Sequence, residues 1–439
     1  MNSNNPVVSS VIKNYSYTQN AFLSKVVTIP LIQEYGSSYR VLVKPGDVVQ
    51  EGEKIAVSEK TDVYPTYIHS SVPGTVTEIV SCTLLNGKQE FAVRIKFGGS
   101  FKYLGKKLPE ENESLLTPAS ITDSLLDKGV INTFDITKPE SLGYQIRRMK
   151  KCGCIAVRMF DEDPYRITDS LVAKFNLEKI IRASRLLAKA LNAGGVVLAI
   201  DQKIQNKASL KEFESDDLKF LEMNIKRYPC GTPREMVSAF SRSSLKKSCN
   251  FSLSKKDLFI DSSSMLEVYN AIILNTPAIS RNIHFSGNCL YSSCMLNVKI
   301  GTPIKDIVSQ LGGFVKTPSL FIINGELGGS SAQSLDMPIT KDIKSVKFVS
   351  SRKITDEQIY SCINCGNCRL ICPVKISPDI LYNSVITSSP LSQTLETSAV
   401  ICNSCGLCST VCQARLPLAQ TISVLKENIL NSNKEQEEQ

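Results

Sequence analysis

The sequence predicts a multidomain α/β protein, and three observations lead to this fold class. The chain of 439 residues is too long for one ordinary hydrophobic core and should divide into about three or four domains. With 42% hydrophobic and 21% charged residues, it has enough apolar side chains to fill several cores. Between residues 115 and 260, segments of helical periodicity alternate with short apolar runs, which is the pattern of an α/β sheet.

Residues 39–57 and 68–80 are two short β-rich halves, each with a glycine at a turn. Paired halves of this kind resemble the barrel-sandwich hybrid of lipoyl and biotin carriers. Such carriers present one lysine at a hairpin tip between the halves, and Lys60 in "SEKTD" lies near that point. Because the flanking pattern of a carrier is missing, we expect Lys60 to be an exposed, unmodified lysine. His69 is expected at a strand start, in a structural role.

Three helices are predicted in the α/β region. The first carries Ile121, Leu125 and Leu126 on one face, and the second carries apolar residues at helical spacing between 177 and 191. The second helix leads into "VVLAI", which is predicted as a buried strand, and the third begins in "TPREMVSAF". Capping residues and glycines mark the helix ends, namely Thr117, Pro118, Gly129, Gly194, Gly195 and Thr232.

Residues 281–323 are expected to form strand, strand, helix and strand. The helix lies in "TPIKDIVSQLGG", with Ile304 and Val308 on the face toward a sheet. Thr302 is the predicted cap of this helix, and Pro303 is expected in its first turn. This segment should therefore be a compact α+β module.

Two runs near the C-terminal end share the cysteine spacing C-x2-C-x2-C-x3-C: "CINCGNCRLIC" at 362–372 and "CNSCGLCSTVC" at 402–412. In two-cluster ferredoxins, three closely spaced cysteines bind one [4Fe-4S] cubane and the fourth binds the other cubane. Gly366 and Gly406 permit the close backbone approach that such loops need. The predicted ligands are Cys362, Cys365, Cys368 and Cys412 for cluster 1, and Cys402, Cys405, Cys408 and Cys372 for cluster 2.

A zinc site is the alternative, since C-x2-C pairs also occur in zinc ribbons, although zinc sites usually take two ligands from each knuckle. Cys152 and Cys154 alternate along a predicted strand. The cysteines outside the two runs are expected to be small buried hydrophobic residues, namely Cys82, Cys152, Cys154, Cys230, Cys249, Cys289 and Cys294.

Composition excludes several classes of protein. No run reaches the roughly 18 apolar residues needed to span a bilayer, and the first residues lack a signal-peptide core, so we expect the chain to stay in the cytoplasm. Fifteen cysteines, an odd number, favour metal binding over a disulfide framework. The net charge of +9 is compatible with anionic lipid or an acidic protein partner, but a surplus this modest is more often a solvated face. No basic stripe is interleaved with aromatic residues, so nucleic acid is not expected.

The domain order resembles RnfC, a component of the Rnf electron transport complex, from about residue 26 to residue 430. The resemblance rests on "IPLIQEYGSSYRVLVKPGDVVQEGEKIA", "IHSSVPGTV", "DEDPYRITDSLVAKFNLEKIIRASRLLAKAL", "YPCGTPREM", "VKIGTPIKDIVSQLGG", "MPITK" and both cysteine runs. It implies an N-terminal tail (1–25), a barrel-sandwich hybrid (26–98), a Rossmann-like α/β domain related to the NADH-binding subunit of complex I (99–260), an SLBB β-grasp module (261–345), a two-cluster ferredoxin domain (346–430) and an acidic tail (431–439).

The resemblance also implies a function. RnfC is a peripheral electron-transfer subunit on the cytoplasmic face of the bacterial inner membrane, in a complex that couples electron transfer to ion translocation. Its expected partners are the membrane subunits, and an acidic ferredoxin-type carrier is a candidate electron partner. As a one-electron relay the chain needs no acid, base or nucleophile, so it is not expected to be catalytic alone.

The chain departs from this family where NADH and FMN would bind. Family members carry the run Gly-Gly-Ala-Gly-Phe-Pro-Thr, whereas this chain has "KGVINTFDITKPESLGYQ", with Gly129 and Gly143 and no glycine between them. A phosphate cradle needs clustered N–H groups that no Cβ shields, so this loop should not form one.

A second departure is "RMFDEDPY", where the family has Asn-Ala-Ala-Glu-Cys-Asp-Pro-Tyr. Met159 and Phe160 replace alanines and could fill a flavin pocket, and Arg158 should narrow it further. The flavin and NADH region near Gly129, Arg158, Asp161 and Asp163 is therefore predicted to be degenerate.

Two other functions are weighed against the complex component. A soluble iron–sulfur flavoprotein resembling cobalamin reductase would have the same kind of cluster domain, but it would need its own flavin. A scaffold whose clusters only hold structure would not need two crossed cysteine runs. The sequence therefore favours the electron-transfer subunit.

Overall fold

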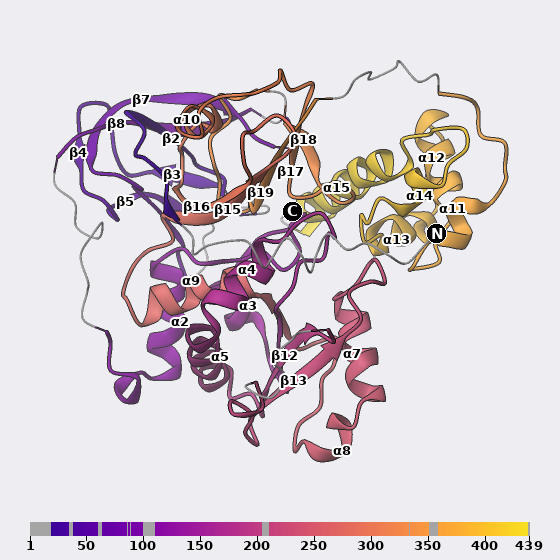
Figure 1. Cartoon of the computed structure of the whole chain (residues 1–439), viewed down its shortest axis with the longest axis horizontal. Helices are drawn as coiled ribbons and strands as arrows, with labels where there is room; N and C mark the ends of the chain where they lie inside the picture. The colour runs from indigo at the N-terminus through magenta and orange to yellow at the C-terminus, as the bar shows by residue number, and fades with distance from the viewer. Residues whose placement is uncertain are drawn as a thin grey trace. The chain divides into compact units, whose positions relative to one another are not determined.

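The computed structural model describes residues 19–34, 38–59, 64–85, 87, 89–99, 110–203, 210–332, 334–350 and 359–437 (Figure 1). Lys60 and residues 1–18 lie outside the described residues. The chain divides into two compact units: residues 1–325 with 330–350, and residues 326–329 with 351–439. Each unit is described by itself.

The first unit begins with two small sheets. One has the strand order β2-β8-β7-β4 and the other β3-β5-β6, and all of these pairings are antiparallel. His69 ends β6 and does not start a strand as predicted; it is buried there. Burial, with Lys341 next in importance, lowers the pKa of His69 to about 3, which keeps the ring neutral. The strands are β2 (Val26–Pro30), β3 (Tyr39–Val41), β4 (Val48–Val49), β5 (Lys54–Ser58), β6 (Tyr67–His69), β7 (Gly74–Thr83) and β8 (Gln89–Phe97).

A four-stranded parallel sheet with the order β13-β12-β11-β14 follows. Alternate residues along each strand belong to two different cores: Ile155 and Val157 of β11 join one with α2, α4, α5 and α9, and Ala156 joins the other with α7. Helices therefore cover both faces of the sheet, as an α/β fold requires. The strands are β11 (Ile155–Arg158), β12 (Val196–Asp201), β13 (Leu218–Met223) and β14 (Leu258–Asp261).

The three predicted helices of this region are confirmed. Thr117 caps α2 in a capping box with Ser120, and Thr232 caps α7 in a capping box with Glu235. Cys152 and Cys154 were expected on a strand, but both precede β11 in irregular backbone, where they are buried. The helices are α2 (Pro118–Asp127), α3 (Leu142–Arg148), α4 (Thr168–Phe175), α5 (Leu177–Leu191), α7 (Pro233–Arg242), α8 (Leu245–Ser248) and α9 (Ser262–Ile272); a 3-10 turn covers Glu113–Leu115, and β9 (Ile131–Asn132) pairs with β10 (Glu140–Ser141).

A six-stranded mixed sheet, ordered β1-β16-β15-β19-β17-β18, completes the first unit with α10 (Ile304–Gln310). Thr302 does not cap α10, because Pro303 holds the extended backbone of the N-cap position. Ile304, Ile307 and Val308 are buried in one core that this sheet shares with β2, β7 and β8. The strands are β1 (Gln19–Asn20), β15 (Ser280–Ser286), β16 (Cys294–Lys299), β17 (Leu320–Ile323), β18 (Ser330–Ala332) and β19 (Ser345–Val349).

The second unit is helical. Gly366 and Gly406 each hold a left-handed conformation (φ 74° and 77°) directly before a short helix in the two cysteine runs. α15 continues to Glu437 and so includes most of the residues expected in the acidic tail. In the part of the chain that the structure describes, no helix is long and apolar enough to cross a membrane. The helices are α11 (Asn367–Ile371), α12 (Pro378–Ile386), α13 (Gln393–Ile401), α14 (Leu407–Thr410) and α15 (Leu418–Glu437).

Candidate iron–sulfur sites and the altered nucleotide region

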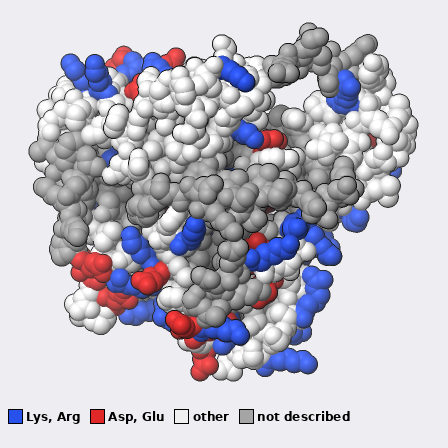
Figure 2. Space-filling model, viewed as in Figure 1, with Lys and Arg blue, Asp and Glu red and all other residues white. Residues whose placement is uncertain are grey.

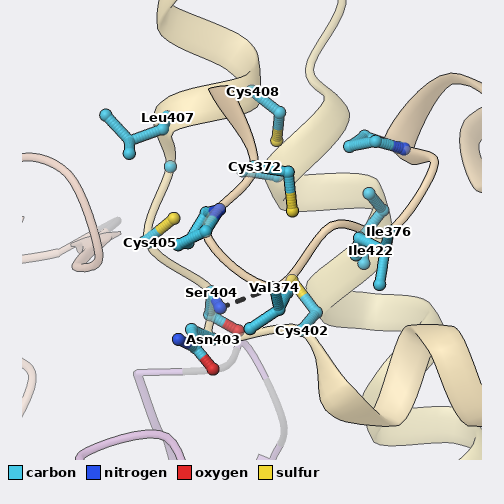
Figure 3. Close-up of a pocket in the computed structure, with 14 residues that line it drawn as sticks. Cys372, Val374, Ile376, Cys402, Asn403, Ser404, Cys405, Leu407, Cys408 and Ile422 are labelled. Atoms are coloured by element: carbon cyan, nitrogen blue, oxygen red, sulfur yellow. Dashed lines mark hydrogen bonds between the residues drawn. The ribbon is translucent and has the colours of Figure 1, made fainter. Parts of the chain in front are cut away.

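A small, partly open pocket lies between the two cysteine runs (Figure 3). Its cysteines are Cys402, Cys405 and Cys408 of the second run and Cys372, the last cysteine of the first run. Apolar side chains from both halves of the unit close the rest of the wall, among them Val374, Ile376, Leu407 and Ile422. The structure thus brings together the four residues predicted to bind cluster 2.

Four cysteine thiols line this pocket, and four cysteines are the ligand set of a [4Fe-4S] cubane. Among the described residues, no three Cys, His, Asp or Glu side chains converge as the ligands of one metal ion do. Each cysteine of a [4Fe-4S] cluster binds a different corner iron, so its four sulfurs surround a volume rather than a point. The residues present therefore fit an iron–sulfur cubane.

The thiols in this cavity are held in an apolar environment. Burial, with smaller contributions from neighbouring cysteines, raises the pKa of Cys405 to about 11 and that of Cys408 to about 12. A metal must therefore displace protons from these sulfurs when it binds. Backbone N–H groups are already directed at sulfur: Ser404 N donates to Cys402 Sγ at 3.4 Å, and Leu416 N donates to Cys412 Sγ at 3.4 Å.

Three of the four residues predicted for cluster 1 lie in or against a small core that also contains Cys408. Cys368 is buried there with Leu416 and Leu418, and Cys362 and Cys412 pack against the same residues at partial burial. Cys365, in contrast, is exposed. The first run therefore exposes one of its predicted ligand cysteines, whereas three cysteines of the second run line a partly open pocket.

At the carboxyl end of β11, the Arg158 side chain is only 1% exposed. Its guanidinium donates to the backbone oxygens of Phe134 (2.9 Å) and Gly231 (3.3 Å), and it lies 4.1 Å from the centroid of the Phe134 ring. It also forms an ion pair with Glu162 at 3.2 Å. Phe134 belongs to the loop "INTFDITKPES" that replaces the family's glycine run. The two departures noticed in the sequence are thus in direct contact.

Side chains are packed closely against Gly231 at the carboxyl end of β11. Its φ is +84°, and a Cβ atom there would lie 2.7 Å from Arg158 Cδ and 2.8 Å from Phe160 Cε2. Phe160 itself is 3% exposed. The backbone of Gly231, which could otherwise approach a ligand closely, is covered by Arg158 and Phe160.

The other residues of the predicted nucleotide region have structural contacts. Asp161 accepts hydrogen bonds from Asp169 N and Ser170 N at the start of α4, both at 3.0 Å. Asp163 Oδ1 accepts one from Tyr165 N at 2.9 Å. Gly129 is packed against Tyr67, and its carbonyl accepts a hydrogen bond from Lys341 Nζ at 2.8 Å.

Sequence reasoning missed a buried ionic network beside this region. Lys344 Nζ lies 2.8 Å from Asp169 Oδ2 and 3.0 Å from Asp261 Oδ2, and all three side chains are fully buried. Thr133 Oγ1, in the replaced loop, donates to Asp261 Oδ2 at 2.8 Å and accepts from Arg281 at 2.8 Å. No spacing or motif connects these residues in the sequence.

Comparison with known proteins adds an independent result. Residues 11–100 match the family model described as the RnfC barrel sandwich hybrid domain. The C-subunit of the Na(+)-translocating ferredoxin:NAD(+) oxidoreductase complex of Acetobacterium woodii is 21% identical, over 81% of this chain and 80% of the relative. The C-subunit of the ion-translocating oxidoreductase complex of Rhodobacter capsulatus is 24% identical, over 91% of this chain and 77% of the relative. The chain is therefore similar to RnfC over most of its length.

This match to RnfC confirms both the resemblance predicted from the sequence and the barrel-sandwich hybrid near the N-terminus. Among solved structures, a chain of an NAD+-reducing [NiFe]-hydrogenase is 12% identical with a TM-score of 0.42, over 71% of this chain and 60% of that chain.

Proposed function

We propose that the chain is the peripheral, RnfC-type electron-transfer subunit of an Rnf-type ion-translocating complex and relays electrons through two [4Fe-4S] clusters. The observation that carries this proposal is the cavity in which Cys372 of the first run meets Cys402, Cys405 and Cys408 of the second. The relatives named above are subunits of ion-translocating oxidoreductase complexes, which supports the assembly with membrane subunits. The proposal includes an SLBB β-grasp module at 261–345, a ferredoxin domain at 346–430 and a position on the cytoplasmic face of the bacterial inner membrane.

The protein's part in such a relay is to fix the ligands and tune the potentials. Each cluster would supply one-electron chemistry. The reduction potential of each cluster would depend on burial and on hydrogen bonds to its sulfurs. Here apolar side chains line the pocket, and backbone N–H groups are directed at Cys402 and Cys412. Arg369 lies beside Cys362 and Cys368, where both oxygens of Asp379 accept hydrogen bonds from its guanidinium.

The α/β domain is proposed to have lost its flavin and NADH site. Arg158, Phe134 and Phe160 fill the end of β11, and Thr133 ties the replaced loop to buried Asp261. Closing this space with side chains leaves no uncovered cluster of backbone N–H groups for a phosphate. The chain would then receive and deliver electrons through protein partners, which also disfavours the cobalamin-reductase-like alternative.

This proposal is tested on anaerobically purified protein. We expect about eight irons and eight acid-labile sulfides per chain, since each of two cubanes holds four of each. No flavin should be extracted after gel filtration, and NADH should not bleach the cluster absorbance. Dithionite should bleach it in the same sample, which serves as the control for intact clusters. Stoichiometric flavin, or bleaching by NADH alone, would restore a complete oxidoreductase site.

The two cysteine runs differ at their surfaces, which predicts the end where electrons are exchanged. Ile363 and Leu370 of the first run are 61% and 76% exposed, whereas Asn403 and Thr410 occupy the equivalent positions of the second run. Exposed apolar side chains beside an exposed ligand cysteine are suited to a transient redox encounter. We therefore expect electrons to be exchanged with the partner at the first cysteine run.

Leu370→Glu is expected to slow reduction of the clusters by a dithionite-reduced ferredoxin at least tenfold, because a charge in the contact opposes both desolvation and an acidic partner. Reduction by excess dithionite alone should not change. Thr410→Glu, at the matching position of the second run, is the control and should react like the unmodified protein. Equal slowing by both variants would contradict the assignment of the exchange end.

A further inference from the structure

One edge of the α/β domain carries a surface of lysine and arginine that the proposed function does not use. Figure 2 shows blue side chains along the edge where Figure 1 places α7 and α8. We call this surface the α7–α8 basic face. It consists of Arg234 and Arg242 on α7, Lys246 and Lys247 on α8, and Lys255 and Lys256 in the turn before β14, all of them exposed.

The fold directs these cations outward. Met236 and Phe240 of α7 are buried against the sheet, which leaves Arg234 and Arg242 on the solvent side of the helix. The ring of Phe251 stacks on that of Phe240, with 6.3 Å between the centroids, and so connects the segment before β14 to α7. The charges are therefore held on packed structure.

The acidic residues nearest in sequence do not neutralise this face. Glu235 serves the capping box of α7, where it accepts hydrogen bonds from Thr232 N and Oγ1 at 3.3 and 3.2 Å. Asp257 is buried and accepts from Gly153 N at 2.7 Å and from Ser254 N at 2.6 Å. Both carboxylates are thus held by neutral donors, and no ion pair among the described residues joins either of them to a cation of this face.

The chemistry of the face fits lipid headgroups better than a protein. Among the described residues between 166 and 290, no large hydrophobic side chain is exposed. A specific protein interface has an apolar or aromatic centre within a polar rim, whereas a membrane with anionic lipids attracts clustered cations by charge alone. Serines separate the cations, as in "SRSSLKKS", although the hydroxyls of Ser243 and Ser248 donate to the backbone oxygens of Phe240 and Leu245.

We propose that the α7–α8 basic face docks on the anionic phospholipid headgroups of a membrane. This deepens the peripheral location in the proposed function, yet it requires neither the clusters nor any partner protein. Each cation near such a surface contributes about fivefold in affinity. Reversing the charge of the four lysines should therefore reduce binding at least a hundredfold.

The test is sedimentation of the full chain with vesicles of phosphatidylcholine alone, or with about one third phosphatidylglycerol. The unmodified protein should sediment with the anionic vesicles only and should be released by raised salt. Changing Lys246, Lys247, Lys255 and Lys256 all to glutamate should abolish sedimentation, while changing them all to arginine should preserve it.

The matched control changes four exposed lysines elsewhere in the first unit to glutamate, which alters the net charge equally; they are Lys25, Lys44, Lys96 and Lys316. This variant should bind anionic vesicles nearly as well as the unmodified protein. Equal loss in both variants would show that net charge, not this face, causes binding. If the unmodified protein did not bind anionic vesicles, lipid docking would be refuted. The remaining partner for the α7–α8 basic face would then be an acidic protein surface. Iron content and circular dichroism, measured on the same samples, separate these outcomes from failure of the fold or of the electron relay.

Discussion

Replacing Cys372 with serine is expected to remove one of the two clusters, so that the iron content falls from about eight to about four per chain. The structure places this residue in the cavity of the second cysteine run, although it belongs to the first run in sequence. Its loss should leave three cysteine ligands there, and we expect the cluster to be lost from this incomplete site. Iron analysis and electron paramagnetic resonance of the dithionite-reduced protein provide the measurement.

Double variants decide which cysteines share a cluster. If Cys372 and Cys405 bind the same cubane, replacing both should cost no more iron than replacing either one, so about four irons should remain. If Cys372 instead belongs with Cys365, that pair should keep about four irons and the Cys372–Cys405 pair should lose nearly all eight. Cys294→Ser, at a half-buried cysteine outside the runs, is the control and should keep the full iron content.

The predictions that succeeded rest on local signals. Thr117 and Thr232 begin helices because each side chain accepts a hydrogen bond from the N–H group three residues later. This interaction involves only four consecutive residues. The cysteine spacing is also a local signal, but the binding of clusters by these cysteines stays a prediction. The cap of α10 was misplaced by one residue, because proline at 303 can hold the N-cap conformation itself, and this local choice is not visible in the pattern.

The contacts that the sequence did not predict join residues that are far apart in the chain. Lys344, Asp169 and Asp261 meet only after three segments have folded together, and each residue alone resembles an ordinary surface charge. The contact between Arg158 and Phe134 could be predicted only in part. Sequence reasoning identified both changed segments, but only the fold shows that the guanidinium lies against the Phe134 ring and carbonyl.

The buried network is expected to matter more to stability than any exposed ion pair. Asp261 caps α9 through Ser264 N at 2.7 Å while its other oxygen faces Lys344. Burial alone would raise the pKa of Asp261, but Lys344 and Arg281 together outweigh burial and hold this pKa below its ordinary value. The wild-type protein therefore gains stability from this carboxylate above about pH 4 and loses it as the pH falls through the depressed pKa.

Lys344→Met should lower the free energy of unfolding by about 3–5 kcal/mol at neutral pH, because it removes the cation that directly contacts two buried carboxylates. Without Lys344, burial should dominate and raise the pKa of Asp261 in the folded state above its unfolded value. The folded state then binds a proton first, so the destabilisation should shrink as the pH is lowered from 7 toward 5. Urea unfolding followed by circular dichroism measures both effects. Lys305→Met is the matched control, since Lys305 pairs with Asp336 on the surface and its removal should barely move the midpoint. A destabilisation that stayed constant with pH would mean that Lys344 contributes through packing of its side chain and not through charge.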